Sequence, residues 1–227
     1  MDNNVYATTT CESGGDITLP TAPTKYGYTF QGWSTYTPIE YLESTGAQWI
    51  DTGILATTQT GIEIKFSSSF VNANNALFGS REAYHNKAFS TWIYGAGGFR
   101  VDIGDNEFLT QSLQKNEIYT IKITNSGIFL NDSFMQVSNV SNGVYSSSTM
   151  FLFEINQNGI PVNFQANPID LQKRIYSAKI YNNDTLVRDF IPVLDGNGVP
   201  CMYDRVEKKY YYNAGTGDFV AGPVIGE

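Results

Sequence analysis

Hydrophobic and polar residues alternate with a period of two along most of this chain, which is the pattern of half-buried β-strands. In the stretch GIEIKF (61–66), the two isoleucines and the phenylalanine share one face, whereas Glu63 and Lys65 share the other. Because successive side chains of a strand point to opposite faces, such a segment buries one face and leaves the other to solvent. The same pattern recurs at 117–124, 149–156 and 186–193.

Short turn signals separate the expected strands at intervals of about 8–12 residues. Clusters of Asn, Asp, Ser and Gly supply these signals, because such residues adopt the backbone angles of tight turns at low cost. About a dozen short strands at this spacing predict an all-β sandwich or barrel. The clearest turn signals are TNSG (124–127), NQNG (156–159), YNND (181–184), DGNG (195–198) and NAGTGD (213–218).

The first 36 residues differ from the rest of the chain. They are rich in Thr, Gly and Pro, and the dense alternation starts only at Thr37. We therefore expect a boundary near Ser34–Pro38. It divides the chain into a partial β-repeat or linker at 1–36 and one large all-β domain at 37–227.

The composition narrows the expected partners. Charged residues make up only 16% of the chain, the net charge is −8 and the pI is about 4.6. An acidic chain without basic clusters argues against nucleic acid and anionic membranes, because phosphate binding requires Lys and Arg. No apolar run approaches the ~20 residues of a membrane span, so we expect no membrane insertion. The first ten residues lack the features of a signal peptide, which favours a virion protein or a piece of a longer surface protein.

Three carboxylates near the start of the large domain raise the possibility of glycosidase chemistry. Glu40 and Glu43 differ by an odd number, so in a regular strand they point to opposite faces, and Asp51 follows in a later segment. A retaining pair needs carboxyls roughly 5 Å apart. The Glu-x-Asp-x-x-Glu pattern of sandwich glycosidases does not occur in the sequence. We expect no catalytic residues.

Metal and cofactor chemistry has little support in the sequence. The loop LDGNG offers oxygens from Asp195 and Asn197, but the terminal bidentate glutamate of a calcium loop is missing. DG and NG also favour hairpin turns without any metal. We expect no metal and no cofactor, with calcium as the alternative. Cys11 and Cys201 are compatible with a disulfide or with two free thiols.

One expected hairpin, FSTWIYGAGGFRVDIGD (89–105), carries the candidate binding site. If its aliphatic side faces the core, Trp92 and Tyr94 are exposed in one strand. Arg100 and Asp102 are then exposed beside them in the next strand. An aromatic ring covers the apolar face of a pyranose, and charged groups bind its hydroxyls. The alternative is that Trp92 or Tyr94 packs in the core or under a loop. Arg81 and Tyr84, from the stretch GSREAYH (79–85), are expected nearby. The predicted ligand-binding residues are therefore Arg81, Tyr84, Trp92, Tyr94, Arg100 and Asp102.

The segment ITLPTAPTKYGYTFQGWST (17–35) resembles the closing half of the Listeria–Bacteroides repeat, a small β-module of the internalin B type. About half a repeat is present. The resemblance implies a spacer or stalk in a cell-surface protein. The residues that carry it are Pro20, Pro23, Thr24, Gly27, Tyr28, Phe30, Gly32 and Trp33.

The large domain resembles the laminin-G and concanavalin A-like jelly-roll domains of surface and phage proteins of gut bacteria. The resemblance implies a two-layer antiparallel β-sandwich, preceded by a short β-rich extension. This fold hosts lectins, hydrolases and interaction domains alike, so it does not define a ligand. The stretches that carry the resemblance are EYLESTGAQWIDTGI (40–54), LFGSRE (77–82) and the C-terminal segment 174–223.

We therefore expect a non-enzymatic recognition domain that binds carbohydrate and mediates adhesion. The expected location is a phage virion (fibre, tail or head decoration) or a bacterial cell surface. The expected partner is a glycan or cell-surface receptor, together with other virion or surface subunits. The alternatives are a purely structural protein–protein interaction module and a glycoside hydrolase.

Overall fold

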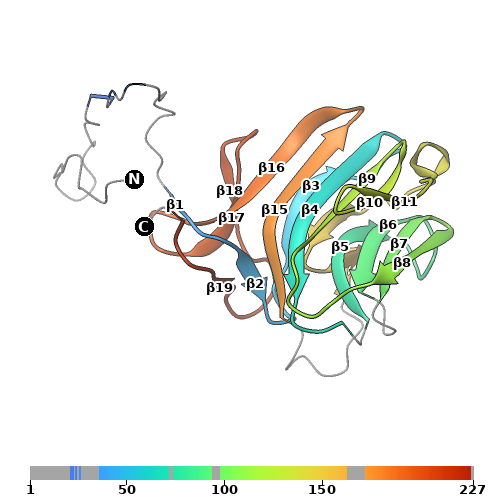
Figure 1. Ribbon diagram of the computed structural model, residues 1–227, viewed down its shortest axis with the longest axis horizontal. Helices are drawn as coiled ribbons and strands as arrows, with labels where there is room; N and C mark the ends of the chain where they lie inside the picture. Colours follow the sequence, from blue (N-terminus) through green and yellow to red (C-terminus); the bar gives the residue numbers. More distant parts are fainter. Residues whose placement is uncertain are drawn as a thin grey trace.

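The computed structural model describes residues 21–22, 24, 26, 36–71, 74–93, 98–162 and 172–225. Within these ranges the chain forms two antiparallel sheets packed as a sandwich (Figure 1), which confirms the expected fold class. The described residues form nineteen strands, more than the dozen expected, because several are pieces of two to four residues. No helix in the described ranges is long and apolar enough to cross a membrane.

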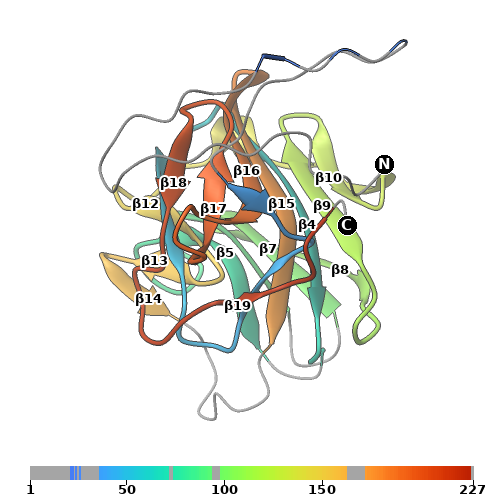
Figure 2. The ribbon, with the colours of Figure 1, turned by 90° about the vertical axis from the view of Figure 1, so that its left-hand side faces the viewer.

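The larger sheet has the strand order β11-β10-β9-β4-β15-β16-β17-β18. Figure 2 shows most of these strands following one another across the view. Their bounds are β4 (Thr60–Ser68), β9 (Tyr119–Thr124), β10 (Gly127–Leu130), β11 (Ser133–Gln136), β15 (Lys173–Asn182), β16 (Thr185–Leu194), β17 (Pro200–Asp204) and β18 (Lys209–Tyr211). Three further strands join this sheet: β1 (Thr37–Pro38) pairs with β16, and β2 (Leu42–Ser44) pairs with β15 and β19 (Val220–Ala221).

The smaller sheet has the strand order β14-β13-β5-β6-β7-β8, with β12 pairing with β3 and β5. Among the described strands, β13 and β5 form the one parallel pair. A short 3₁₀ helix, η1 (Val140–Asn142), lies between β11 and β12. The bounds are β3 (Ile50–Leu55), β5 (Asn75–Arg81), β6 (Ala88–Ile93), β7 (Gly98–Gly104), β8 (Asn106–Ser112), β12 (Thr149–Leu152), β13 (Ile155–Gln157) and β14 (Ile160–Val162).

The hydrophobic core lies between the two sheets, where the alternating pattern places it. Ile62, Ile64 and Phe66 of β4 are all buried. The ring of Phe66 stacks on Phe99 of β7, with centroids 5.3 Å apart. Packing of these inward faces removes apolar surface from water, which is the main favourable term in folding.

A buried lysine links the two sheets. Lys173, fully buried at the start of β15, donates from Nζ to the carbonyl oxygen of Ala76 at 2.8 Å and to that of Phe153. Glu154 Oε1 lies 4.0 Å from the same nitrogen. Burial lowers the pKa of the Lys173 ammonium to about 8, although the Glu154 charge acts in the opposite direction.

The strand β16 runs along the full length of the larger sheet, parallel to the strand direction. Its first residue follows the turn at Asn183–Asp184, and its last residue, Leu194, pairs with Thr37 of β1. The C-terminal segment returns to the same end, where Val224 bridges Ile39.

Candidate functional site

Three predicted site residues lie together on one face of the smaller sheet. Trp92 in β6 pairs with Arg100 in β7, and Asp102 follows two residues later on the same face. The prediction that this face is exposed is wrong. Only 1% of Trp92, 2% of Arg100 and 0% of Asp102 is exposed.

These three side chains form a buried hydrogen-bonded network. The indole Nε1 of Trp92 donates to Asp102 Oδ2 at 3.0 Å, and Arg100 Nε donates to Asp102 Oδ1 at 2.9 Å. The Arg100 guanidinium lies 4.6 Å from the centroid of the Trp92 ring. Burial raises the pKa of the Asp102 carboxyl, while the hydrogen bond and charge of Arg100 act in the opposite direction. The network satisfies polar groups that would otherwise be costly to bury.

The loop between β5 and β6 covers this network. Arg100 Nη1 donates to Tyr84 Oη at 2.9 Å, and Nη2 pairs with Glu107 Oε2 at 3.0 Å. The Tyr84 ring meets the Trp92 ring edge to face at a centroid distance of 5.8 Å. His85 also lies against the guanidinium. Strand alternation shows which side chains share a face, but it does not show whether a loop lies over that face.

The remaining predicted site residues have different positions. Arg81 is 2% exposed, and its Nε donates to Gln157 Oε1 at 2.9 Å. Its guanidinium lies 5.7 Å from the Tyr84 ring centroid, and Tyr84 itself is 54% exposed. Tyr94 lies outside the described residues. A binding role for this cluster stays a prediction, with Tyr84 as the most exposed of its five described members.

The carboxylates near the start of the domain have separate surroundings. Glu43 is buried and accepts a 2.6 Å hydrogen bond from Arg174 Nε. Asp51 is exposed and accepts a 2.9 Å bond from the backbone N–H of Gly53. Glu40 is exposed.

The LDGNG loop uses its aspartate within the turn. Asp195 Oδ1 accepts hydrogen bonds from the backbone N–H groups of Asn197 and Val199, both at 2.8 Å. Asp195 Oδ2 accepts a 2.9 Å bond from Tyr212 Oη. The described residues hold no group of three or more His, Cys, Asp or Glu that is arranged for a metal ion. Cys201 is a buried free thiol, while Cys11 lies outside the described ranges.

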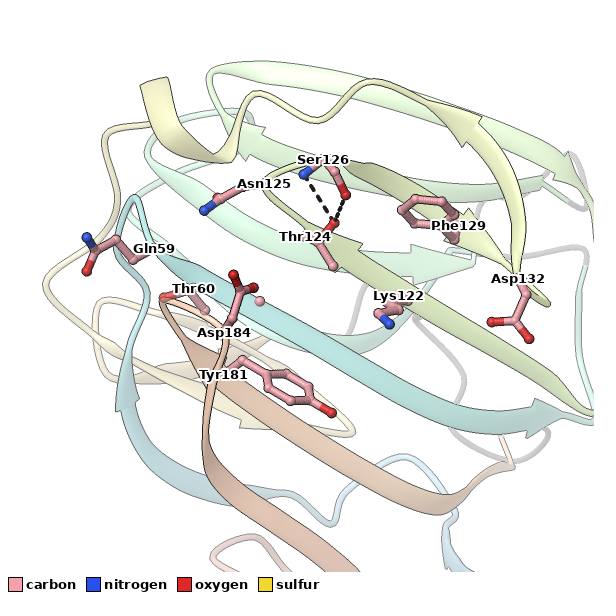
Figure 3. Close-up of a pocket in the computed structure, with 11 residues that line it drawn as sticks. Gln59, Thr60, Lys122, Thr124, Asn125, Ser126, Phe129, Asp132, Tyr181 and Asp184 are labelled. Carbon is pink, nitrogen blue, oxygen red and sulfur yellow. Dashed lines mark hydrogen bonds between the residues drawn. The ribbon is translucent and has the colours of Figure 1, made fainter.

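A pocket of about 400 Å³ lies on the outer face of the larger sheet (Figure 3), within the range of small-molecule sites. It is built from the ends of β4, β9 and β15, the start of β10, and the turns between them. Segments that are more than a hundred residues apart in the sequence thus meet in one hollow. The lining residues are Gln59, Thr60, Gly61, Lys122, Thr124, Asn125, Ser126, Phe129, Asp132, Tyr181 and Asp184.

Gly61 forms the floor of the pocket. It lies in β4 opposite Tyr181 of β15, on the outer face. A Cβ atom at Gly61 would lie 3.3 Å from the carbonyl oxygen of Ile123 and 3.6 Å from Tyr181 Cβ. Because the strand carries no side chain at this point, a hollow opens between the neighbouring strands.

Two tight turns contribute a carboxylate each. Asn183 and Asp184 form the two-residue loop between β15 and β16, with φ angles of 49° and 61°. Asn131 and Asp132 form the same kind of loop between β10 and β11, with φ angles of 48° and 60°. Positive φ at both central residues defines a type I′ turn, in which Asn and Asp are favoured. Turn chemistry therefore fixes the positions of Asp184 and Asp132 in the pocket lining.

Aromatic and polar side chains form the walls. Figure 3 shows Tyr181 on one side, Phe129 on the other, and Lys122 between them. Lys122 pairs across the strands with Phe129, and its Nζ lies 3.9 Å from Glu63 Oε2. Thr124 Oγ1 and Ser126 Oγ share a 2.8 Å hydrogen bond.

The electrostatics of the pocket disfavour an anionic ligand. Burial raises the pKa of the Tyr181 phenol, and the neighbouring charge of Glu63 adds to the rise, so the hydroxyl stays protonated at neutral pH. Lys122 is the one cation among the lining residues, against the carboxylates of Asp132 and Asp184. Half-buried rings next to hydroxyl, amide and carboxylate groups suit a polyhydroxylated ligand with apolar C–H faces.

The sequence contained weak signals for this pocket. The turn motifs at 124–127 and 181–184 were predicted as turns, and both now border the pocket. An isolated glycine at the start of an alternating strand, Gly61, is a further signal of close backbone approach or a gap. None of these signals shows that the segments meet in space.

The fold and the pocket define a β-sandwich domain with a ligand-sized hollow on its outer face. The model of the Listeria-Bacteroides repeat domain family matches residues 1–45, which include β1 and β2 of the larger sheet. The chain is similar in structure to a protein from Bacteroides ovatus ATCC 8483 that is described as a proposed carbohydrate-binding protein, with a TM-score of 0.56 and 12% sequence identity. The likeness covers 83% of this chain and 61% of that protein, so this chain spans less than two thirds of its length. No curated protein matches the chain in sequence.

Proposed function

We propose that this chain carries a carbohydrate-recognition domain of a surface protein, of the concanavalin A and laminin-G type of sandwich. The observation that supports the proposal most strongly is the pocket over Gly61, where the Tyr181 and Phe129 rings flank polar groups. A pyranose has apolar C–H faces that pack on such rings and hydroxyls that bond to such polar groups. The structural likeness to the Bacteroides ovatus protein, which is described as a proposed carbohydrate-binding protein, also supports the proposal.

The proposed role is binding without catalysis. Of the carboxylates weighed for glycosidase chemistry, Glu43 is paired with Arg174, and Asp51 accepts a bond from its own turn. Sustained hydrolysis of a polysaccharide by the purified chain would contradict this part of the proposal. The Listeria-Bacteroides repeat match supports a location at a cell surface, with a virion as the alternative.

The test is a binding measurement on a panel of neutral and acidic glycans, followed by calorimetry on the best ligand. Tyr181→Ala is expected to weaken binding about 10- to 100-fold, which is roughly 1.4–2.8 kcal/mol, because it removes an aromatic wall of the pocket. Tyr176→Ala is the matched control, because Tyr176 is a half-buried tyrosine on the same strand that does not line the pocket. No binding to any glycan of the panel, or equal affinities for Tyr181→Ala and the unchanged chain, would overturn the proposal.

A further inference from the structure

Phe134 lies beside the pocket on the outermost strand of the larger sheet. It is 57% exposed in β11, a four-residue strand that pairs with β10 alone among the described strands. Phe134 pairs directly with Phe129, which lines the pocket. The two rings meet edge to face, with centroids 5.6 Å apart and an interplanar angle of 72°.

A second glycine allows the Phe134 ring to lie against the sheet. A Cβ atom at Gly127 of β10 would lie only 2.7 Å from Phe134 Cε2, so any other residue there would displace the ring. Gly61 leaves space for the pocket, and Gly127 leaves space for the Phe134 ring beside it. The Phe134 ring therefore adjoins Phe129 on the outer face, between the pocket and the edge of the sheet.

The cross-strand contact with Phe129 stabilises the β10–β11 pair, but it leaves 57% of Phe134 exposed. An apolar side chain on an edge strand favours unwanted pairing with other chains, so proteins usually place charged residues there. Phe134 packs against Phe129, which lines the pocket together with polar residues. An exposed aromatic ring in contact with a ring that lines a polar pocket is well placed to contact a ligand that extends beyond the pocket.

The dimensions of the sheet indicate the length of the ligand. From Tyr181 in β15 to Phe134 in β11, the strand order is β15-β4-β9-β10-β11, which makes four strand spacings. At about 4.8 Å per spacing, the two backbones are about 19 Å apart. A single sugar ring is much shorter than this distance, whereas a short oligosaccharide that crosses the strands reaches both aromatic residues.

We propose that Phe129 and Phe134 form a second sugar subsite next to the pocket, so that the ligand is an oligosaccharide that crosses the strands from β15 toward β11. The proposal rests on the proposed carbohydrate-binding function of the pocket. Tyr181 and the polar lining hold one sugar unit over Gly61, and Phe134 packs on the C–H face of a further unit of the same chain.

The test is calorimetry with neutral oligosaccharides of one to six units. The probes are the β-1,4-linked glucose, mannose, xylose and N-acetylglucosamine series and the α-1,4-linked glucose series. For the series that binds, affinity is expected to rise about tenfold or more with chain length. Phe134→Ala is expected to abolish this rise and to leave the affinity for the shortest binding unit unchanged.

Two controls separate this inference from the proposed function. Val137→Ala removes another exposed apolar side chain next to β11 and is expected to change nothing. Tyr181→Ala is expected to weaken binding at every chain length. If affinity is independent of chain length and Phe134→Ala has no effect, the second subsite is wrong although the pocket stands. If none of the five series binds, both the subsite and the binding of neutral glycans by the pocket are overturned.

Discussion

The indole nitrogen of Trp92 donates a 3.0 Å hydrogen bond to Asp102, and 1% of the tryptophan and 0% of the aspartate is exposed. Ala76 and Ile155 pack around the indole to form a small apolar cluster that is separate from the main core. The pair stabilises the smaller sheet and the loop above it.

Replacing Trp92 therefore tests a structural role. Trp92→Ala is expected to lower the free energy of unfolding by about 3–5 kcal/mol, because it opens a cavity and removes a donor from a buried carboxylate. Urea denaturation measures this loss. Tyr84→Ala removes a more exposed ring that meets Trp92 edge to face, so it is expected to lower the free energy of unfolding by less. A fully stable Trp92→Ala protein with weakened glycan binding would instead restore the binding role predicted from the sequence.

Gly61→Val is expected to abolish ligand binding while the fold is retained. The valine side chain would project between Tyr181 and Thr124 and fill the floor of the pocket. Valine suits a β-strand, but its Cβ would lie only 3.3 Å from the Ile123 carbonyl oxygen, so the free energy of unfolding is expected to fall by about 1–3 kcal/mol while the fold is retained. Calorimetry and thermal unfolding measure the two effects. Lys65→Val is the control, because Lys65 is an exposed residue of the same strand outside the pocket. Unchanged affinity in Gly61→Val would place the ligand elsewhere.

The buried ammonium of Lys173 is expected to make stability rise with pH above about 8. Its pKa is about 8 in the folded chain and near 10.5 in the unfolded chain. Between these values the unfolded chain binds the proton more tightly, so raising the pH favours the folded state. One such group contributes a slope of at most about 1.4 kcal/mol per pH unit.

Urea titrations between pH 7.5 and 9.5 measure this slope, with Lys173→Met as the comparison. The difference between the two proteins is informative because other groups act in the opposite direction at higher pH. Burial raises the pKa of the Cys201 thiol and of the Tyr211 phenol to about 12, so both reduce stability once their unfolded forms ionise. Identical pH profiles for the two proteins would show that Lys173 keeps an ordinary pKa.

The pocket is expected to prefer neutral glycans over sulfated or uronic acid-containing ones. Asp132 and Asp184 repel an anionic ligand, and Lys122 is also close to Glu63. Asp184→Asn should strengthen binding of a sulfated glycan about two- to fivefold at low salt, the scale of one exposed charge interaction. Asparagine tolerates the positive φ of this turn, so the backbone should be retained. Asp218→Asn is the control, because Asp218 is exposed and lies outside the pocket. Stronger binding of sulfated than of neutral glycans by the unchanged chain would contradict the expectation.

The sequence allowed the fold, but not the pocket, to be predicted. Alternation correctly separated Val101 of the core from Arg100 and Asp102 of the opposite face, because a period of two is a local property. Whether that face is exposed depends on how the loop around Tyr84, which connects β5 and β6, folds over it. The pocket is harder still to predict, because Gly61 and Tyr181 become neighbours only through the pairing of β4 with β15.

The strand β16 has a mechanical consequence for the proposed glycan-binding role. One end adjoins Asp184 at the pocket, and the other end pairs with Thr37 in β1. Its ten residues span about 30 Å. A pull between a glycan bound in the pocket and Thr37 therefore runs along the strand. The backbone hydrogen bonds to β15 and β17 lie across this direction, so they share the load in shear and do not open one after another.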